Sequence, residues 1–146
     1  MATLGQWQYT CDYPATQSAY LLAKTGGAES CSCNTCRNFV AVRERVLPTE
    51  FTALLRSLGM EYTKDAEVYH LGRLPSGEHR YGGWFHFAGK LEKTGDFPMV
   101  AMSPNLKIWL RNGNAPHLET LNGVPRVQLE FDLINVPWVL DEAEPE

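Results

Sequence analysis

The chain has 146 residues, a length typical of one domain with one hydrophobic core. Its 44% hydrophobic and 21% charged residues are typical of a globular protein and argue against a disordered chain. The formal net charge of −4 disfavours nucleic acid as a partner, because binding to phosphates depends on clustered lysine and arginine.

No apolar run approaches the ~20 residues of a membrane-spanning helix, and the first residues lack the basic and apolar parts of a secretory signal. We therefore expect a cytoplasmic protein with no membrane partner. The predicted organisation is a single domain over residues 1–140 and an acidic, solvated tail at 141–146.

The N-terminal third contains two predicted strands, at residues 6–11 and 18–24, on either side of a proline-containing turn. A helix follows, for which Asn34 is a suitable N-cap and whose apolar residues recur at helical spacing. A second helix begins near Pro48 and ends at Gly59, where a left-handed C-cap is expected. Its apolar stripe consists of Phe51, Leu54, Leu55 and Leu58.

From residue 67 onward the pattern changes to alternation of apolar and polar residues, which is typical of antiparallel strands. The predicted strands cover residues 67–72, 80–91, 105–111 and 126–133. A sheet with one apolar face needs a cover, and the two helices are the available layer. The predicted fold class is therefore α+β, an antiparallel sheet covered on one face by a short helical pair; a barrel-like curl of the long strands is the alternative.

Three cysteines, Cys31, Cys33 and Cys36, form the one concentrated chemical signal of the sequence. Cys31 and Cys33 would lie on the same side of an extended backbone, and Cys36 would lie in the first turn of the helix. A structural zinc site needs four tetrahedral ligands, usually a tight local set and a distant one. We predict Zn²⁺ bound by these three cysteines and by Cys11, with His70 and His86 as substitutes for the fourth ligand.

Two other hypotheses for the cysteines remain open. Cysteine behaves as a small hydrophobic residue, so all four could be buried free thiols. Alternatively Cys33 and Cys36 form a Cys-x-x-Cys pair at the start of a helix, the position of a redox-active dithiol. The expected antiparallel sheet argues against the second hypothesis, because thioredoxin-like motifs follow a buried strand in a βαβ unit.

The aromatic segment 81–89 places Trp84 and His86 on one face of a strand, so a pocket built with Tyr81 is conceivable, although aromatic residues at this spacing are usually core. The adjacent glycines, Gly82 and Gly83, indicate a bulge or a close approach of a ligand. The histidines are interpreted as structural, with His79 and His117 exposed. No phosphate loop or hydrolase elbow occurs, so no catalytic residue is predicted.

Several segments together resemble a family of small, uncharacterised bacterial proteins over roughly residues 29–140. They are Cys31-Ser-Cys-Asn-Thr-Cys-Arg-Asn-Phe39, Leu47-Pro48, Leu54 to Gly59, Glu67-Val-Tyr69, Tyr81-Gly-Gly-Trp-Phe-His-Phe87 and Pro137-Trp-Val-Leu140. The resemblance implies a bacterial, intracellular origin and the relevance of the cysteines, and it carries no activity.

These observations predict a zinc-stabilised module that binds an unknown protein or small molecule. One alternative is a thiol oxidoreductase that uses Cys33 and Cys36. A protein-interaction partner of the phage or toxin–antitoxin type is a further alternative, suggested by the small size, the acidity and the lack of catalytic motifs.

Overall fold

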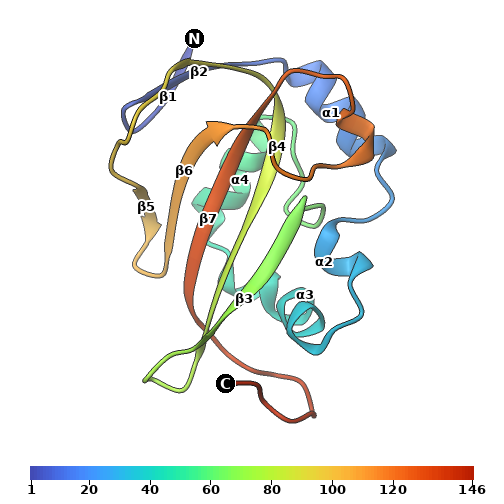
Figure 1. The fold of residues 1–146 in the computed structure, drawn as a ribbon, viewed down its shortest axis with the longest axis vertical. Helices are drawn as coiled ribbons and strands as arrows, with labels where there is room; N and C mark the ends of the chain where they lie inside the picture. The colour runs from blue at the N-terminus through green and yellow to red at the C-terminus, as the bar shows by residue number, and fades with distance from the viewer.

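One antiparallel sheet of seven strands organises the chain, and the computed structural model describes all residues from 1 to 146 (Figure 1). The strands are β1 (Ala2–Leu4), β2 (Trp7–Cys11), β3 (Glu67–Arg73), β4 (His79–Lys93), β5 (Val100–Ser103), β6 (Leu106–Asn112) and β7 (Arg126–Val136). The helices are α1 (Tyr13–Leu22), α2 (Gly27–Ser30), α3 (Asn34–Val46) and α4 (Thr49–Ser57), with a 3-10 turn η1 (Glu119–Leu121). None of the helices is both long and apolar enough to cross a membrane.

The 15-residue strand β4 is the centre of the sheet. It pairs with β7 along most of its length, with β3 beside its first half and with β2 beside its second half, and every pairing is antiparallel. Five of the six predicted strands are confirmed as β2, β3, β4, β6 and β7, whereas β1 and β5 were not predicted. Both are only three or four residues long, too short for a clear alternation pattern.

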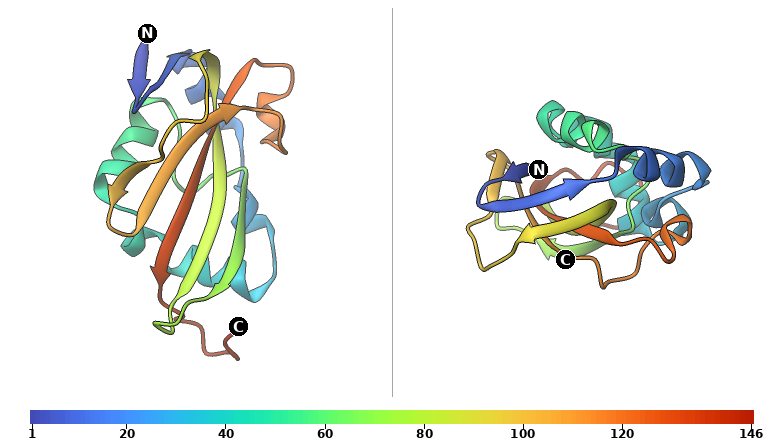
Figure 2. Two further views of the ribbon diagram at one scale, coloured as in Figure 1. Left: turned by 60° about the vertical axis from the view of Figure 1, so that its left-hand side comes forward. Right: turned by 90° about the horizontal axis from the view of Figure 1, so that it is seen from above.

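Helices α3 and α4 pack on one face of the sheet, which confirms the predicted α+β fold class (Figure 2). Phe51 of α4 contacts the rings of Phe85 and Phe131, with centroid distances of 6.1 and 6.2 Å. Phe39 of α3 lies between Tyr81 and Phe131, 5.5 and 6.2 Å away. The core is thus an aromatic layer between the helical pair and strands β4 and β7. Gly59, with φ of +93°, follows α4 in the predicted left-handed conformation.

The strand predicted at residues 18–24 is wrong, because this segment belongs to helix α1. Local capping favours this helix: the Asp12 carboxylate accepts a hydrogen bond from the backbone N–H of Ala15, and Pro14 lies in the first turn. Tyr20 then points inward and donates to the carbonyl of His86 at 2.7 Å. The sheet is consequently covered by three longer helices instead of two.

Gly82 and Gly83 of β4 leave room for neighbouring groups that pack directly against the strand backbone. A Cβ atom at Gly82 would meet the Tyr69 ring at 2.8 Å, and one at Gly83 would meet the Phe131 ring at 2.8 Å and the backbone carbonyl of Glu67. The register shift of this strand falls between His79 and Tyr81, outside the glycine pair. The glycines therefore serve internal packing.

We predict that Gly83→Ala lowers the free energy of unfolding by about 1–3 kcal/mol, because the new methyl group must displace a buried ring and a strand carbonyl. Gly82→Ala is the matched control and should cost less, since the Tyr69 side chain is 37% exposed and free to move. Urea denaturation measures both. Equal costs would contradict the packing explanation.

Candidate metal centre

The junction between α2 and α3 brings three cysteines together. Cys31 is the C-cap of α2, and its backbone N–H donates to the carbonyl of Gly27 at 3.1 Å. Cys33 is the N-cap of α3, one residue before the predicted cap Asn34, and Cys36 lies in the first turn. All three sulfur atoms lie within 4.8 Å of one another, and none forms a disulfide.

Helix α2 is only four residues long and is held in place by contacts with the segment before β3. The backbone N–H of Gly27 donates to the carbonyl of Asp65 at 2.8 Å, and that of Ala28 donates to the Asp65 carboxylate at 3.1 Å. Glu29 pairs with Arg43 of α3. These contacts fix the position of Cys31, because a helix this short has little stability of its own.

The three thiols differ in exposure and in acidity. Cys33 is exposed, Cys31 is half-buried and Cys36 is 7% exposed. The Thr35 hydroxyl, 3.3 Å from the Cys33 sulfur, is the largest of the influences that lower the pKa of Cys33 to about 6. Burial, reinforced by the other two thiols, raises the pKa of Cys36. The cluster therefore has an accessible side, formed by the acidic thiol of Cys33, and a buried side, formed by the thiol of Cys36.

This arrangement suits a soft cation. At a Zn–S distance of about 2.3 Å, tetrahedral ligation places sulfur atoms about 3.8 Å apart. The sulfurs of Cys31 and Cys33 are 3.1 Å apart, closer than that spacing, and all three sulfurs lie within 4.8 Å of one another. Three cysteines could hold a metal ion here, and the exposed side leaves a fourth position for water or another ligand.

Cys11 does not belong to the cluster, contrary to the prediction of a four-cysteine set. It lies at the end of β2 opposite Gly89 of β4, and its thiol donates to the carbonyl of Leu58 at 3.4 Å. The predicted substitutes are also elsewhere: His86 contacts Gln128, and His70 contacts His79. The physical reason is the length of β4, whose Gly89 end pairs with β2, whereas Tyr81 near its start contacts Thr35 beside the cysteines.

Two residues of this region were not singled out from the sequence. Thr35 lowers the pKa of Cys33, and Arg37 donates from Nε to the carbonyl of Ser32 at 3.1 Å, which braces the loop between the first two cysteines. A hydroxyl and a cation within the motif Cys-Asn-Thr-Cys-Arg were the available signals. Their roles depend on the turn that the chain makes at Cys33.

The pocket considered from Tyr81, Trp84 and His86 is not formed, because Tyr81 faces the core on the other side of β4. Trp84 instead lines a polar hollow of about 590 Å³ with Gln128 and Glu130. His86 is 1% exposed, and burial lowers its pKa to about 4. It is a structural residue, as predicted, bonded to Gln128 at 3.0 Å.

A scan of protein-family models, a search of curated proteins and a search of solved structures each found no match for this chain. What the cysteines do is therefore inferred from their geometry.

Asp65, the anchor of α2, generates a prediction for the pH dependence of stability. Burial raises its pKa to about 6, against the lowering influence of the Ala28 N–H. Because this pKa lies above the value of about 3.9 in an unfolded chain, the stabilising contribution is complete below about pH 4 and is lost as the pH rises through about 6. By this group alone, the free energy of unfolding should fall by about 2–3 kcal/mol between pH 4 and pH 7.

Asp65→Asn should remove that part of the slope, measured by urea denaturation at a series of pH values. The exposed Asp96→Asn variant retains Asp65 and should keep the slope of the unmodified protein. Parallel profiles for the protein and its Asp65→Asn variant would contradict the role of burial at this carboxylate.

Proposed function

We propose that Cys31, Cys33 and Cys36 bind one Zn²⁺ ion, and that the protein is a zinc-stabilised binding module. The observation that carries the proposal is the convergence of three free sulfurs at a helix junction. Thiolates prefer soft and borderline cations such as zinc to magnesium or calcium.

The ion would connect the end of one helix to the start of the next. Cys31 belongs to the end of α2, and Cys33 and Cys36 belong to the start of α3. Metal binding at such a junction is coupled to folding, because the ligands converge only in the folded chain. The function of the ion is on this view structural, and a fourth ligand from water or a partner completes its coordination.

We predict about one zinc per chain in protein purified without a histidine tag, measured by elemental mass spectrometry. Cys31→Ser, Cys33→Ser and Cys36→Ser should each reduce zinc content at least several-fold. They should also lower the melting temperature by about 4–8 °C, as expected for a loss of about 2 kcal/mol in a chain of this size.

Cys11→Ser is the matched control, because Cys11 lies outside the cluster. It should retain full zinc content. A metal-free protein in which the three cluster variants melt like the unmodified chain would contradict the proposal, as would equal loss of zinc in all four variants.

A thiol oxidoreductase is the second candidate function, favoured by the contrast between exposed Cys33 and buried Cys36. The Cys33 thiolate would attack a disulfide of a substrate protein, break its S–S bond and form a mixed disulfide, releasing one substrate thiolate. Cys36 would then lose its proton and attack the Cys33 sulfur, which breaks the mixed disulfide and releases the second substrate thiolate. Two electrons thus pass to the substrate, and a Cys33–Cys36 disulfide remains. The fully antiparallel sheet argues against a thioredoxin-like origin of this pair.

The redox alternative predicts that metal-free protein forms a Cys33–Cys36 disulfide that is reversible by dithiothreitol and accelerates reduction of a model protein disulfide. Thiol counting and peptide mapping by mass spectrometry measure it, with Cys31→Ser as the control that retains the pair. A chain that holds zinc and forms no such disulfide after chelation would exclude this alternative.

A further inference from the structure

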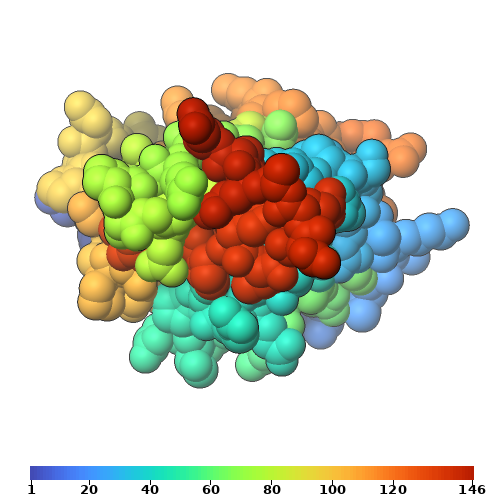
Figure 3. Space-filling model, turned by 90° about the horizontal axis from the view of Figure 1, so that it is seen from below, coloured from blue at the N-terminus to red at the C-terminus, as the bar shows by residue number.

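Residues 137–144, which we call the strap, follow β7 and lie across the end of the molecule beside α3 and the β3–β4 turn. Figure 3 shows this segment on the surface between the two elements. The strap belongs to no helix or strand. The predicted tail at 141–146 is largely exposed, yet two of its glutamates have protein partners, so it is not simply solvated.

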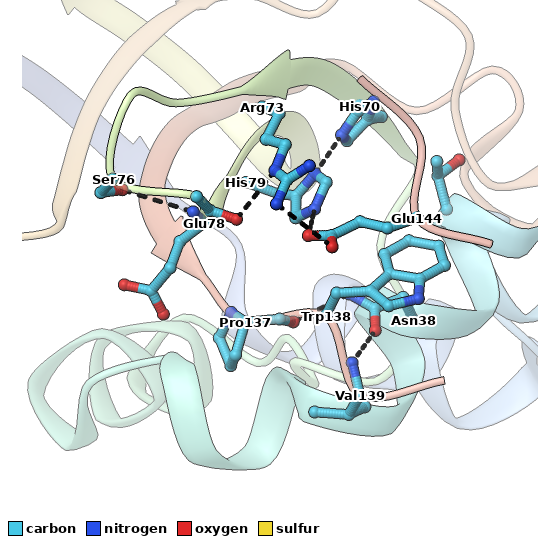
Figure 4. A network of polar contacts seen from close by, with 12 residues as sticks. Asn38, His70, Arg73, Ser76, Glu78, His79, Pro137, Trp138, Val139 and Glu144 are labelled. Carbon is cyan, nitrogen blue, oxygen red and sulfur yellow. Dashed lines mark hydrogen bonds and ion pairs between the residues drawn. The ribbon is translucent and has the colours of Figure 1, made fainter. Parts of the chain in front are cut away.

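Asn38 of α3 binds the backbone of the strap with both ends of its amide. Its Nδ2 donates to the carbonyl of Pro137 at 3.0 Å, and its Oδ1 accepts from the backbone N–H of Val139 at 2.8 Å (Figure 4). Asn38 is fully buried, so these bonds satisfy an amide that would otherwise be costly. Because they involve only backbone atoms of the strap, they can hold any extended segment in this place.

Two carboxylates of the strap are bound by cationic or imidazole groups. Arg37 forms a two-pronged ion pair with Glu142, a geometry that favours carboxylates over other acceptors. Glu144 accepts from His79 Nε2 at 2.7 Å and pairs with Arg73 at 3.5 Å. The surface therefore recognises two negative charges two residues apart.

His79 is completely buried, which corrects the expectation that it is exposed. Its Nδ1 lies 2.8 Å from Nε2 of His70, and its ring faces the indole of Trp138 at 5.5 Å. With its Nε2–H donated to Glu144, His79 accepts at Nδ1 from Nε2 of His70 (Figure 4). His70 thus fixes the ring that receives the second carboxylate.

The strap lies outside the hydrophobic core, and its one aromatic contact is that of Trp138 with His79. Val139 is 42% exposed, and the Glu142 side chain is 41% exposed. Segments with few buried apolar contacts open locally at low free energy, well below global unfolding. The strap can therefore leave while the sheet and helices stay folded, and its surface then becomes accessible.

We propose that Arg37, Asn38, Arg73 and His79 form a peptide-binding site that the strap occupies in cis, and that the site takes an acidic segment of a partner protein in trans. The segment would contain an aromatic residue followed four and six residues later by glutamates, as in Trp138, Glu142 and Glu144. This inference names the ligand of the binding module proposed above and rests on that part of the proposed function.

The site adjoins the cysteine cluster through Arg37, which contacts both the Ser32 carbonyl and Glu142. A short tether gives the strap an effective concentration in the millimolar range, so an external peptide competes poorly with it. Binding in trans must therefore be measured on a chain whose strap is released. Full-length E142K/E144K serves this purpose, because its lysines are repelled by the arginines that hold the glutamates.

The test is fluorescence anisotropy of a labelled peptide with the sequence of residues 136–146. We expect it to bind E142K/E144K about 10- to 100-fold more tightly than the unmodified protein, whose strap competes. The same peptide with glutamine at positions 142 and 144 should bind at least ten-fold more weakly. Adding R37Q and R73Q to the released variant should abolish binding, because these changes remove both cations without creating new ion pairs with the introduced lysines.

Circular dichroism and thermal melting establish that each variant is folded, and zinc content is measured on the same samples. If the protein contains no zinc but binds the peptide, only the metal proposal is overturned. If a folded, strap-released chain does not bind the peptide, the proposal of a peptide-binding site is overturned. Equal binding of the glutamine peptide would also overturn it. If the unmodified protein forms a dimer and E142K/E144K does not, the ligand of the site is the strap of a second copy and not a separate partner.

Discussion

The burial of Phe39 is the constraint on which the rest of the structure depends. Its ring is 1% exposed and lies between Tyr81 of β4 and Phe131 of β7, which sets both the position of α3 and its rotation about its axis. The Tyr81 hydroxyl reinforces this by donating to the carbonyl of Thr35 at 2.7 Å. Cys36, three residues before Phe39, consequently faces inward on the same side of the helix.

The first two turns of α3 thus serve two adjacent sites. Cys33 and Cys36 face the cysteine cluster, whereas Arg37 and Asn38 face the strap. Arg37 contacts both the loop between the cysteines and the strap carboxylate. A change in the cysteine loop, by metal binding or by oxidation, would therefore alter the support of the strap, which gives the two proposals a common structural element.

Polar groups on the outer face of the sheet show how the fold accommodates buried charge. His86, Gln128 and Glu130 are nearly buried and form a hydrogen-bonded chain, with 3.0 and 2.6 Å between successive partners. Arg111 completes it with contacts of 3.4 Å to Glu130. The Gln128 and Glu130 side chains are fully bonded within this chain, whereas Nδ1 of His86 is buried without a hydrogen-bond partner.

The elements that were predicted correctly are those whose sequence signals lie within the element itself. The alternation in β7, the apolar stripe of α4 and the left-handed Gly59 were all predictable, because each depends on period or on backbone conformation. Helix α1 was missed although its cap, Asp12, stood in the sequence. The closeness of Cys31, Cys33 and Cys36 was predictable for the same reason, since at most five positions separate them.

Only the tertiary structure decided what joins residues far apart in the chain. It separated Cys11 from the other cysteines, because the strand that pairs with it extends away from them. It buried His79 beneath Glu144, 65 positions later, and brought Glu142 to Arg37, 105 positions earlier. Such contacts follow from the packing of whole elements and not from the period of any one segment, which is why the sequence predicted the cysteine cluster and the sheet but not the strap.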